Sequence, residues 1–191
     1  MKSLFAVMSI LPALTFLSGC NFEQANALPD PEELTAEATG HYCQMIIANH
    51  AGPKAQIFVS GQEKPFWFPS VRDAFAFIML PGEAKNVRAF YVNDMGVAQN
   101  WDHPETDTWT NALKAVFVID SLKKGGMNLN EVVPFSTREA AQEFTLAHKG
   151  RVVTFDEVSV EYVFADTSLT GDVGSHKKTS MDSSGSRRQT Q

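Results

Sequence analysis

The sequence predicts an α+β protein made of two tandem ββαβ units, each a small sheet packed on a helix. Two observations predict this fold. The order strand, strand, helix, strand occurs twice along the chain, which indicates an internal repeat. Each expected helix also begins with a serine that is followed three residues later by an acidic side chain, a pattern typical of helix N-termini.

The first unit is expected over residues 39–98. Runs rich in β-branched and aromatic residues predict its strands, and apolar residues at helical spacing predict its helix. Ser70 is the expected N-cap of this helix, and Asp73 supplies the carboxylate of the capping box. The strands are expected at 54–59, 64–68 and 87–92, and the helix at 70–80.

The second unit, together with the loop before it, is expected over residues 99–165. Ser136 and Glu139 form its expected capping box. Aromatic side chains on both helices, such as Phe75 and Phe144, fall at core-facing spacing and are assigned to packing rather than to a cofactor. The strands are expected at 114–119, 131–135 and 151–155, and the helix at 136–149.

The start of the chain has the pattern of a bacterial lipoprotein signal peptide, expected over residues 1–19. Lys2 gives a positive start, residues 4–17 are almost wholly apolar, and Ser18-Gly19 precede Cys20 as in a lipobox. An apolar run of this length is too short for a membrane span. Cys20 is therefore the predicted site of lipidation, with an ordinary secretory signal as the alternative. The lipid would anchor the mature chain to the outer or the inner membrane.

Two further segments are expected outside the folded units. Residues 20–38 are expected to form a flexible tether, because they contain two prolines and several acidic side chains. Residues 166–191 are expected to be disordered, because Ser, Thr, Gly, Asp and basic residues leave almost nothing to bury.

The balance of charge argues against nucleic acid as a partner. The chain has 16 basic and 22 acidic side chains, a formal net charge of −6. No basic stripe is present in the sequence. Because nucleic-acid binding depends on basic side chains that neutralise phosphates, no nucleic-acid partner is expected.

His41, Cys43 and Met45 form a short motif with the donor atoms of a soft-metal site. The sequence has two cysteines, and lipidation of Cys20 would leave Cys43 as the one free thiol in an oxidising compartment. If residues 40–47 are extended, the three side chains of the motif point to one face. Thiolate and thioether donors favour Cu(I), whereas zinc and iron–sulfur sites require more thiolates. The alternatives are a buried, inert cysteine and a methionine that fills the core.

Met127 is a further candidate on the residues alone. It lies in the turn Gly125-Gly126-Met127-Asn128, where an apolar side chain in an otherwise polar loop has no obvious core to join. A methionine tucked under the loop is an equally good interpretation.

Several short motifs follow one another along the folded part of the chain. They are the run from His41 to Ile57, Tyr91-Val92-Asn93-Asp94-Met95 with Trp101 shortly after, Gly125-Gly126-Met127, Val133-Pro134-Phe135, and the helix over 140–150. Together they cover about residues 38–158 and resemble the signature of the NosL family, the lipoprotein copper chaperones accessory to nitrous oxide reductase. Two positions depart from the family pattern: Gln44 stands where glycine is usual, and Gly126 stands where proline usually precedes the methionine.

The resemblance implies a periplasmic protein that binds Cu(I) through Cys43 and Met45. It points to Met127 as a further thioether ligand from the second unit, with His41 as the second candidate for that position. It also implies delivery of copper through an ABC-type membrane complex towards nitrous oxide reductase. On this interpretation the protein is not an enzyme.

Two other classes of function are alternatives. A structural adaptor lipoprotein would dock a membrane complex through the loop that carries Trp101 and Trp109, and the sulfur pair would be incidental. The family fold is also similar to that of alkylmercury lyases, whose chemistry uses a pair of cysteines with an acid. Because lipidation would leave only Cys43 free, catalysis is the less favoured alternative. Stoichiometric Cu(I) binding that disappears with Cys43 would distinguish a chaperone from both.

Overall fold

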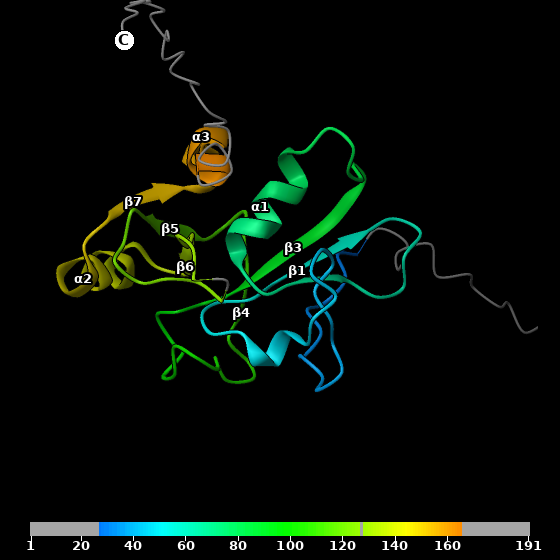
Figure 1. Ribbon diagram of the computed structural model, residues 1–191, viewed down its shortest axis with the longest axis horizontal. Coiled ribbons are helices and arrows are strands. Elements are labelled where there is room, and N and C mark those ends of the chain that lie inside the picture. Colours follow the sequence, from blue (N-terminus) through cyan, green and yellow to red (C-terminus); the bar gives the residue numbers. More distant parts are fainter. Residues whose placement is uncertain (1–26, 127, 166–191) are drawn as a thin grey trace, which may run out of the picture.

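Two antiparallel sheets form the framework of the protein (Figure 1). The computed structural model describes residues 27–126 and 128–165. The first sheet has the strand order β2-β1-β3-β4, and the second has the order β6-β5-β7. The first unit comprises β1 (Ala55–Val59), β2 (Phe66–Phe68), α1 (Val71–Met79), β3 (Val87–Asn93) and β4 (Trp109–Asn111); the second comprises β5 (Val116–Ile119), β6 (Val133–Phe135), α2 (Arg138–His148) and β7 (Arg151–Thr154). The predicted order strand, strand, helix, strand is present in both units, which confirms the tandem ββαβ fold.

Several elements go beyond the sequence-based prediction. β4 extends the first sheet by pairing antiparallel with β3. A short helix, α3 (Val160–Phe164), ends the described chain and packs against α1. Two 3-10 turns, η2 (Ile47–Asn49) and η3 (Phe155–Glu157), complete the set. All of these segments are five residues or fewer, too short for hydrophobic periodicity to reveal.

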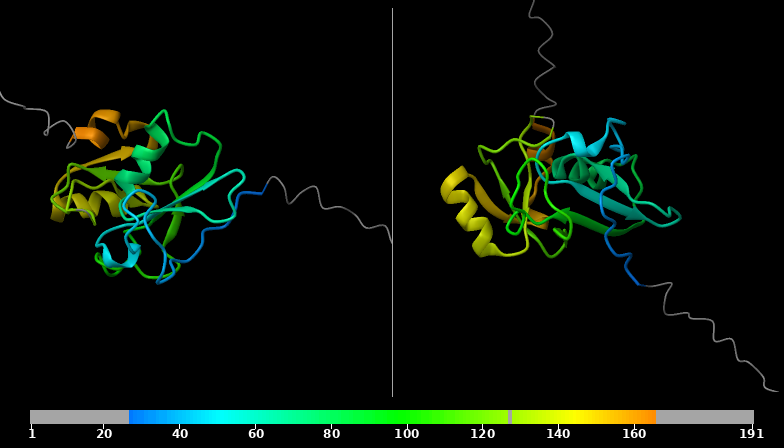
Figure 2. Two further views of the ribbon diagram at one scale, coloured as in Figure 1. Left: turned by 45° about the vertical axis from the view of Figure 1, so that its right-hand side comes forward. Right: turned by 90° about the horizontal axis from the view of Figure 1, so that it is seen from below.

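The central strand β1 is buried along its whole length, because both faces of the first sheet are covered. α1 covers one face, and residues 27–38 run along the other (Figure 2). Gln56 on β1 exchanges two hydrogen bonds of 2.8 Å with the backbone of Glu32. The hydroxyl of Tyr91 on β3 donates to the carbonyl of Pro29 at 2.7 Å. The described part of the expected tether is therefore held on the sheet by hydrogen bonds, which corrects the flexible conformation predicted for it.

α1 begins directly after its predicted N-cap and α2 begins two residues after its predicted start, but the caps of both helices differ from the prediction. Ser70 is the N-cap residue of α1, yet its side chain makes no hydrogen bond to the helix. In α2 the N-cap is Thr137 rather than Ser136, and its hydroxyl accepts a hydrogen bond from the amide of Ala140 at 3.3 Å. The capping box predicted with Ser136 and Glu139 is therefore wrong, because the N-cap lies one residue later and its third helical residue, Ala140, has no carboxylate.

The two units share one hydrophobic core. Phe75 on α1 contacts Phe117 on β5 with ring centroids 5.3 Å apart. Side chains alternate along β5, so Phe117 faces this shared core while Val118 faces a second, smaller cluster with Ala141 of α2. The two units therefore form one folded body. Within the described residues, no helix has the length and hydropathy needed to cross a bilayer.

Candidate metal-binding site

The segment that carries Cys43 is a tight hairpin. Thr39 pairs with Ile46 in an antiparallel bridge, and the amide of Gly40 donates to the carbonyl of Met45 at 2.9 Å. The amide of Gln44 turns back to the carbonyl of Gly40, also at 2.9 Å. Residues 40–47 are therefore not extended, so alternation does not place His41, Cys43 and Met45 on one face.

Gln44 explains how this hairpin forms without the glycine that is usual in the resembling family. Its φ angle is 56°, in the left-handed region that favours glycine. The side-chain amide of Gln44 donates to the carbonyls of His41 at 2.8 Å and Gly40 at 3.3 Å. These two hydrogen bonds from the Gln44 side chain stabilise the turn and help to offset the backbone strain of the left-handed conformation.

Cys43 lies against the base of the hairpin as a partly buried free thiol. A Cβ atom at position 40 would lie 2.6 Å from Cys43 Sγ and 3.3 Å from Pro69 Cδ, so a larger residue here would displace the sulfur from its present position. Met45 is 45% exposed, and neither sulfur residue belongs to a hydrophobic core cluster. Both soft donors are therefore available at the surface of the first unit.

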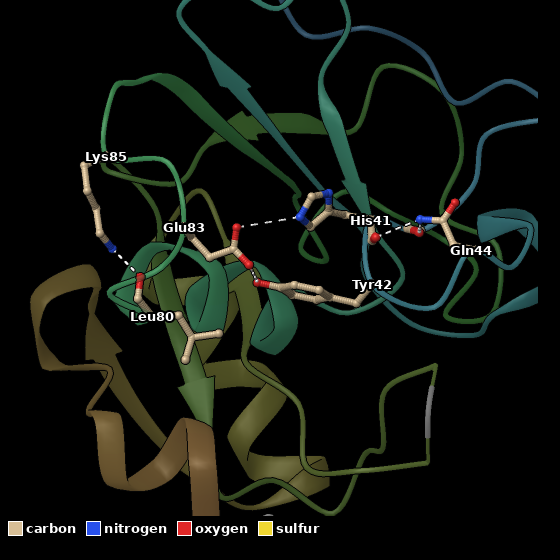
Figure 3. Close-up of polar contacts among 7 residues, drawn as sticks. His41, Tyr42, Gln44, Leu80, Glu83 and Lys85 are labelled. Carbon is tan, nitrogen blue, oxygen red and sulfur yellow. Dashed lines mark hydrogen bonds and ion pairs between the residues drawn. The ribbon is translucent and has the colours of Figure 1, made fainter.

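His41 points away from the turn, towards the segment that joins α1 to β3 (Figure 3). Its ring packs on Phe66 with centroids 4.4 Å apart, and its Nε2 lies 3.8 Å from Oε2 of Glu83. The hydroxyl of the next residue, Tyr42, donates to the other oxygen of Glu83 at 2.9 Å. Burial, followed by this hydrogen bond, raises the pKa of Tyr42. Glu83 thus holds two consecutive residues beside Cys43, and His41 could bind a metal through Nε2 only by leaving this carboxylate.

The glycine pair of the second unit reaches the same proline as the hairpin. A Cβ atom at Gly126 would lie 3.0 Å from the carbonyl oxygen of Pro69 and 2.6 Å from Cβ of His50. The Nδ1 of His50 lies 3.1 Å from the carbonyl oxygen of Gly126, within hydrogen-bond distance. Pro69 therefore lies close to both glycines, to Gly40 through its ring and to Gly126 through its carbonyl oxygen. Met127 and Cys20, two of the predicted site residues, lie outside the described residues.

Sequence reasoning missed three residues that shape this region: Glu83, Pro69 and Glu131. Glu131 is 1% exposed and accepts hydrogen bonds from the start of α1. A carboxylate directly before the apolar run Val132-Val133-Pro134-Phe135 is unusual, and that local signal could have identified Glu131. Glu83 and Pro69 carry no such signal, because their roles depend on contacts made across the fold.

The tryptophans of the loop over residues 99–109 pack against the protein. Trp101 is half-buried and stacks on Phe144 of α2 with centroids 6.0 Å apart, while Lys123 lies over its ring. Trp109 packs on Trp67 at 5.7 Å. The exposed tryptophan surface that an adaptor would need is therefore reduced. Within residues 27–126 and 128–165, no three His, Cys, Asp or Glu side chains are grouped to hold a metal ion.

Comparisons with known proteins agree in both sequence and structure. The NosL family model matches residues 31–163. The copper-binding lipoprotein NosL of Achromobacter cycloclastes is 40% identical over 160 residues, which cover 83% of this chain and 82% of that protein. The copper-binding lipoprotein NosL of Stutzerimonas stutzeri is 27% identical over 143 residues, covering 74% and 73% of the two chains.

A solved structure extends the agreement to the fold. The crystal structure of the copper chaperone NosL from Shewanella denitrificans superposes with a TM-score of 0.65 at 30% identity, covering 69% of this chain and 96% of that one. The matched family residues include the Cys43 hairpin, Pro69 and the glycine pair. The chain belongs to the NosL family.

Proposed function

We propose that this protein is a lipid-anchored periplasmic chaperone for Cu(I), held as cargo by Cys43 and Met45, with Met127 completing a three-sulfur site. The observation that carries the proposal is the meeting of Gly40 and Gly126 at Pro69. This contact brings the residue before Met127 to the base of the hairpin that holds the free thiol. The copper-binding names of the relatives support the choice of metal.

Soft donors also suit the transfer of the ion. The thiolate of Cys43 is the form that binds metal, so copper uptake releases a proton and weakens as pH falls. A site with two or three sulfur ligands has room for an incoming ligand to join before a resident one leaves. Copper is then passed on by associative exchange without release of free Cu(I). The 45% exposure of Met45 places one ligand where an acceptor can approach.

We further propose an ABC-type membrane complex as the acceptor, with nitrous oxide reductase as the final recipient of the copper. A lipid on Cys20 would keep the protein at the membrane where such a complex lies. Catalysis is not part of the proposal, because lipidation leaves Cys43 as the one free thiol of the sequence.

Anaerobic Cu(I) titration against a competing chelator tests the site, using the full chain in detergent. We expect one tightly bound Cu(I) per chain, lost in Cys43→Ser and weakened in Met45→Ala and Met127→Ala. Met79→Ala is the matched control, because Met79 packs against the shared core. His41→Asn tests the other candidate for the third ligand. Undiminished binding in every variant, or none in the wild type, would move the copper role elsewhere and favour the adaptor.

A further inference from the structure

Glu131 is a fully buried carboxylate that the proposed ligand set does not use. Its Oε1 accepts three hydrogen bonds: from Ser70 Oγ at 3.1 Å, from the amide of Arg72 at 3.0 Å and from the amide of Val132 at 2.9 Å. Burial raises its pKa from 4.5 to about 7. A carboxylate buried at such a cost needs a compensating role in the structure.

The first part of that role is to cap α1 from the other unit. The first amides of a helix have no partner within the helix, and a side chain normally supplies one. Ser70 occupies the N-cap position but donates its hydroxyl to Glu131 instead of capping the helix. Glu131, from the second unit, accepts a hydrogen bond from the amide of Arg72 in place of Ser70. A negative charge at this end of the helix is also favoured by the helix dipole.

The second part is a contact with the glycine pair. A Cβ atom at position 125 would lie 2.0 Å from Oε2 of Glu131, so the carboxylate occupies the space beneath Gly125. Gly126 follows directly and abuts Pro69, which precedes Ser70 in the chain. Gly40 lies close to the ring of Pro69 and to the sulfur of Cys43. One carboxylate is thus connected, through two short segments, to both turns of the proposed copper site.

We propose that Glu131 is a positioning residue for copper binding, which sets the Gly125-Gly126 turn of the second unit against the Cys43 hairpin of the first without touching the ion. The inference rests on the proposed function. Residues that orient metal ligands from behind typically change metal affinity by about 10- to 100-fold when replaced. We expect a loss of that size in Glu131→Gln.

The test compares Glu131→Gln with Glu157→Gln by competitive Cu(I) titration of the full chain in detergent. Glu157 is the matched control because it too accepts hydrogen bonds at the start of a helical turn, from the amide and hydroxyl of Thr154 at 2.7 and 2.9 Å. Circular dichroism checks that each variant is folded. Weaker Cu(I) binding in Glu131→Gln alone supports the proposal, and wild-type affinity in a folded Glu131→Gln overturns it.

A double-mutant cycle separates positioning from general loss of stability. If Glu131 acts by placing the second-unit turn, its replacement weakens binding in the Met45→Ala background but adds little in the Met127→Ala background. An equal loss in both backgrounds overturns the proposal. If Met127→Ala binds Cu(I) with wild-type affinity, the second-unit turn contributes no ligand and the proposal is also overturned. Copper binding that depends on Cys43 would survive this result. Binding that persists in Cys43→Ser is the separate failure of the proposed function.

Gly125→Ala gives an independent route if Glu131→Gln fails to fold. The added Cβ collides with the carboxylate, so Gly125→Ala is expected to weaken Cu(I) binding by itself. In a Glu131→Ala background the space of the carboxylate is vacant, so Gly125→Ala is expected to cause no further loss of Cu(I) affinity. If Gly125→Ala weakens Cu(I) binding as much in the Glu131→Ala background as in the wild type, the contact between Gly125 and Glu131 does not transmit the effect. That result would overturn the proposal.

Discussion

α1 and α2 occupy equivalent positions in the two units, yet their surroundings differ. Five of the nine residues of α1 are buried, whereas Ala141 is the one buried residue among the eleven of α2. The N-terminus of α1 is capped by Glu131 from the other unit, and that of α2 by its own Thr137. A repeated topology therefore produces one central helix that joins the units and one peripheral helix. The candidate metal site is built beside the central one.

The largest contrast is expected in the core. Phe75→Ala on α1 removes a fully buried ring that contacts Phe117 of the other unit, and should lower the free energy of unfolding by about 3–5 kcal/mol. Phe144→Ala on α2 removes a ring that is only partly buried and should cost less. Urea unfolding followed by circular dichroism measures both. Equal losses would show that the two helices contribute alike.

The two caps should differ in their response to pH. Burial raises the pKa of Glu131 to about 7, so the folded state binds its proton more tightly than the unfolded chain does. This contribution to stability is complete below the unfolded pKa of 4.5 and is lost as pH rises through 7. Relative to Glu131→Gln, the wild type should lose up to about 3 kcal/mol between about pH 5 and pH 8.

Urea unfolding at both pH values measures this difference. Thr137→Ala is the control, because the hydroxyl cap of α2 does not titrate in this range. The same pH dependence in the wild type and in Glu131→Gln would contradict the prediction.

The cap of α2 should show its own, smaller effect. Thr137→Ala removes the hydroxyl that accepts from the amide of Ala140, and should cost about 1 kcal/mol in unfolding free energy. Ser136→Ala, one residue earlier on an exposed position, should change stability by less than about 0.5 kcal/mol. Thermal unfolding of the two variants compares them. A larger loss in Ser136→Ala would restore the capping box predicted from the sequence.

The smallest effect is expected at the hairpin beside α1. Tyr42→Phe removes the hydrogen bond to Glu83 and should cost about 0.5–1 kcal/mol, because the contact is exposed. The loss should be local, seen as faster amide hydrogen exchange of Gln44, whose amide closes the turn on Gly40. Tyr91→Phe is the matched control, since its hydroxyl bonds Pro29 on the other face of the sheet. Equal exchange rates in the two variants would contradict a role for Glu83 in holding the hairpin.

Local pattern predicted most of the secondary structure. Eight of the nine strands and helices in the two units begin and end within two residues of their predicted bounds, and α1 begins directly after its predicted N-cap. β4 escaped prediction because Trp109-Thr110-Asn111 is short and half-buried, with little alternation to detect. The hairpin escaped because Gln44 adopts a backbone conformation that its residue type rarely favours. The assignments of Cys43, Met45, Met127 and His41 as metal ligands remain predictions.

The sequence by itself determined the repeat, the order of strands and helices, the presence of one thiol and one thioether two residues apart, and the lipoprotein pattern at the start. These are local properties, carried by residue type and short spacing. Only the tertiary structure decided that Gly40 and Gly126 meet at Pro69, that His41 turns to Glu83 and that Glu131 caps a helix 59 residues away. The physical reason is that such contacts depend on how the two sheets pack around α1, and no single stretch of sequence encodes that packing.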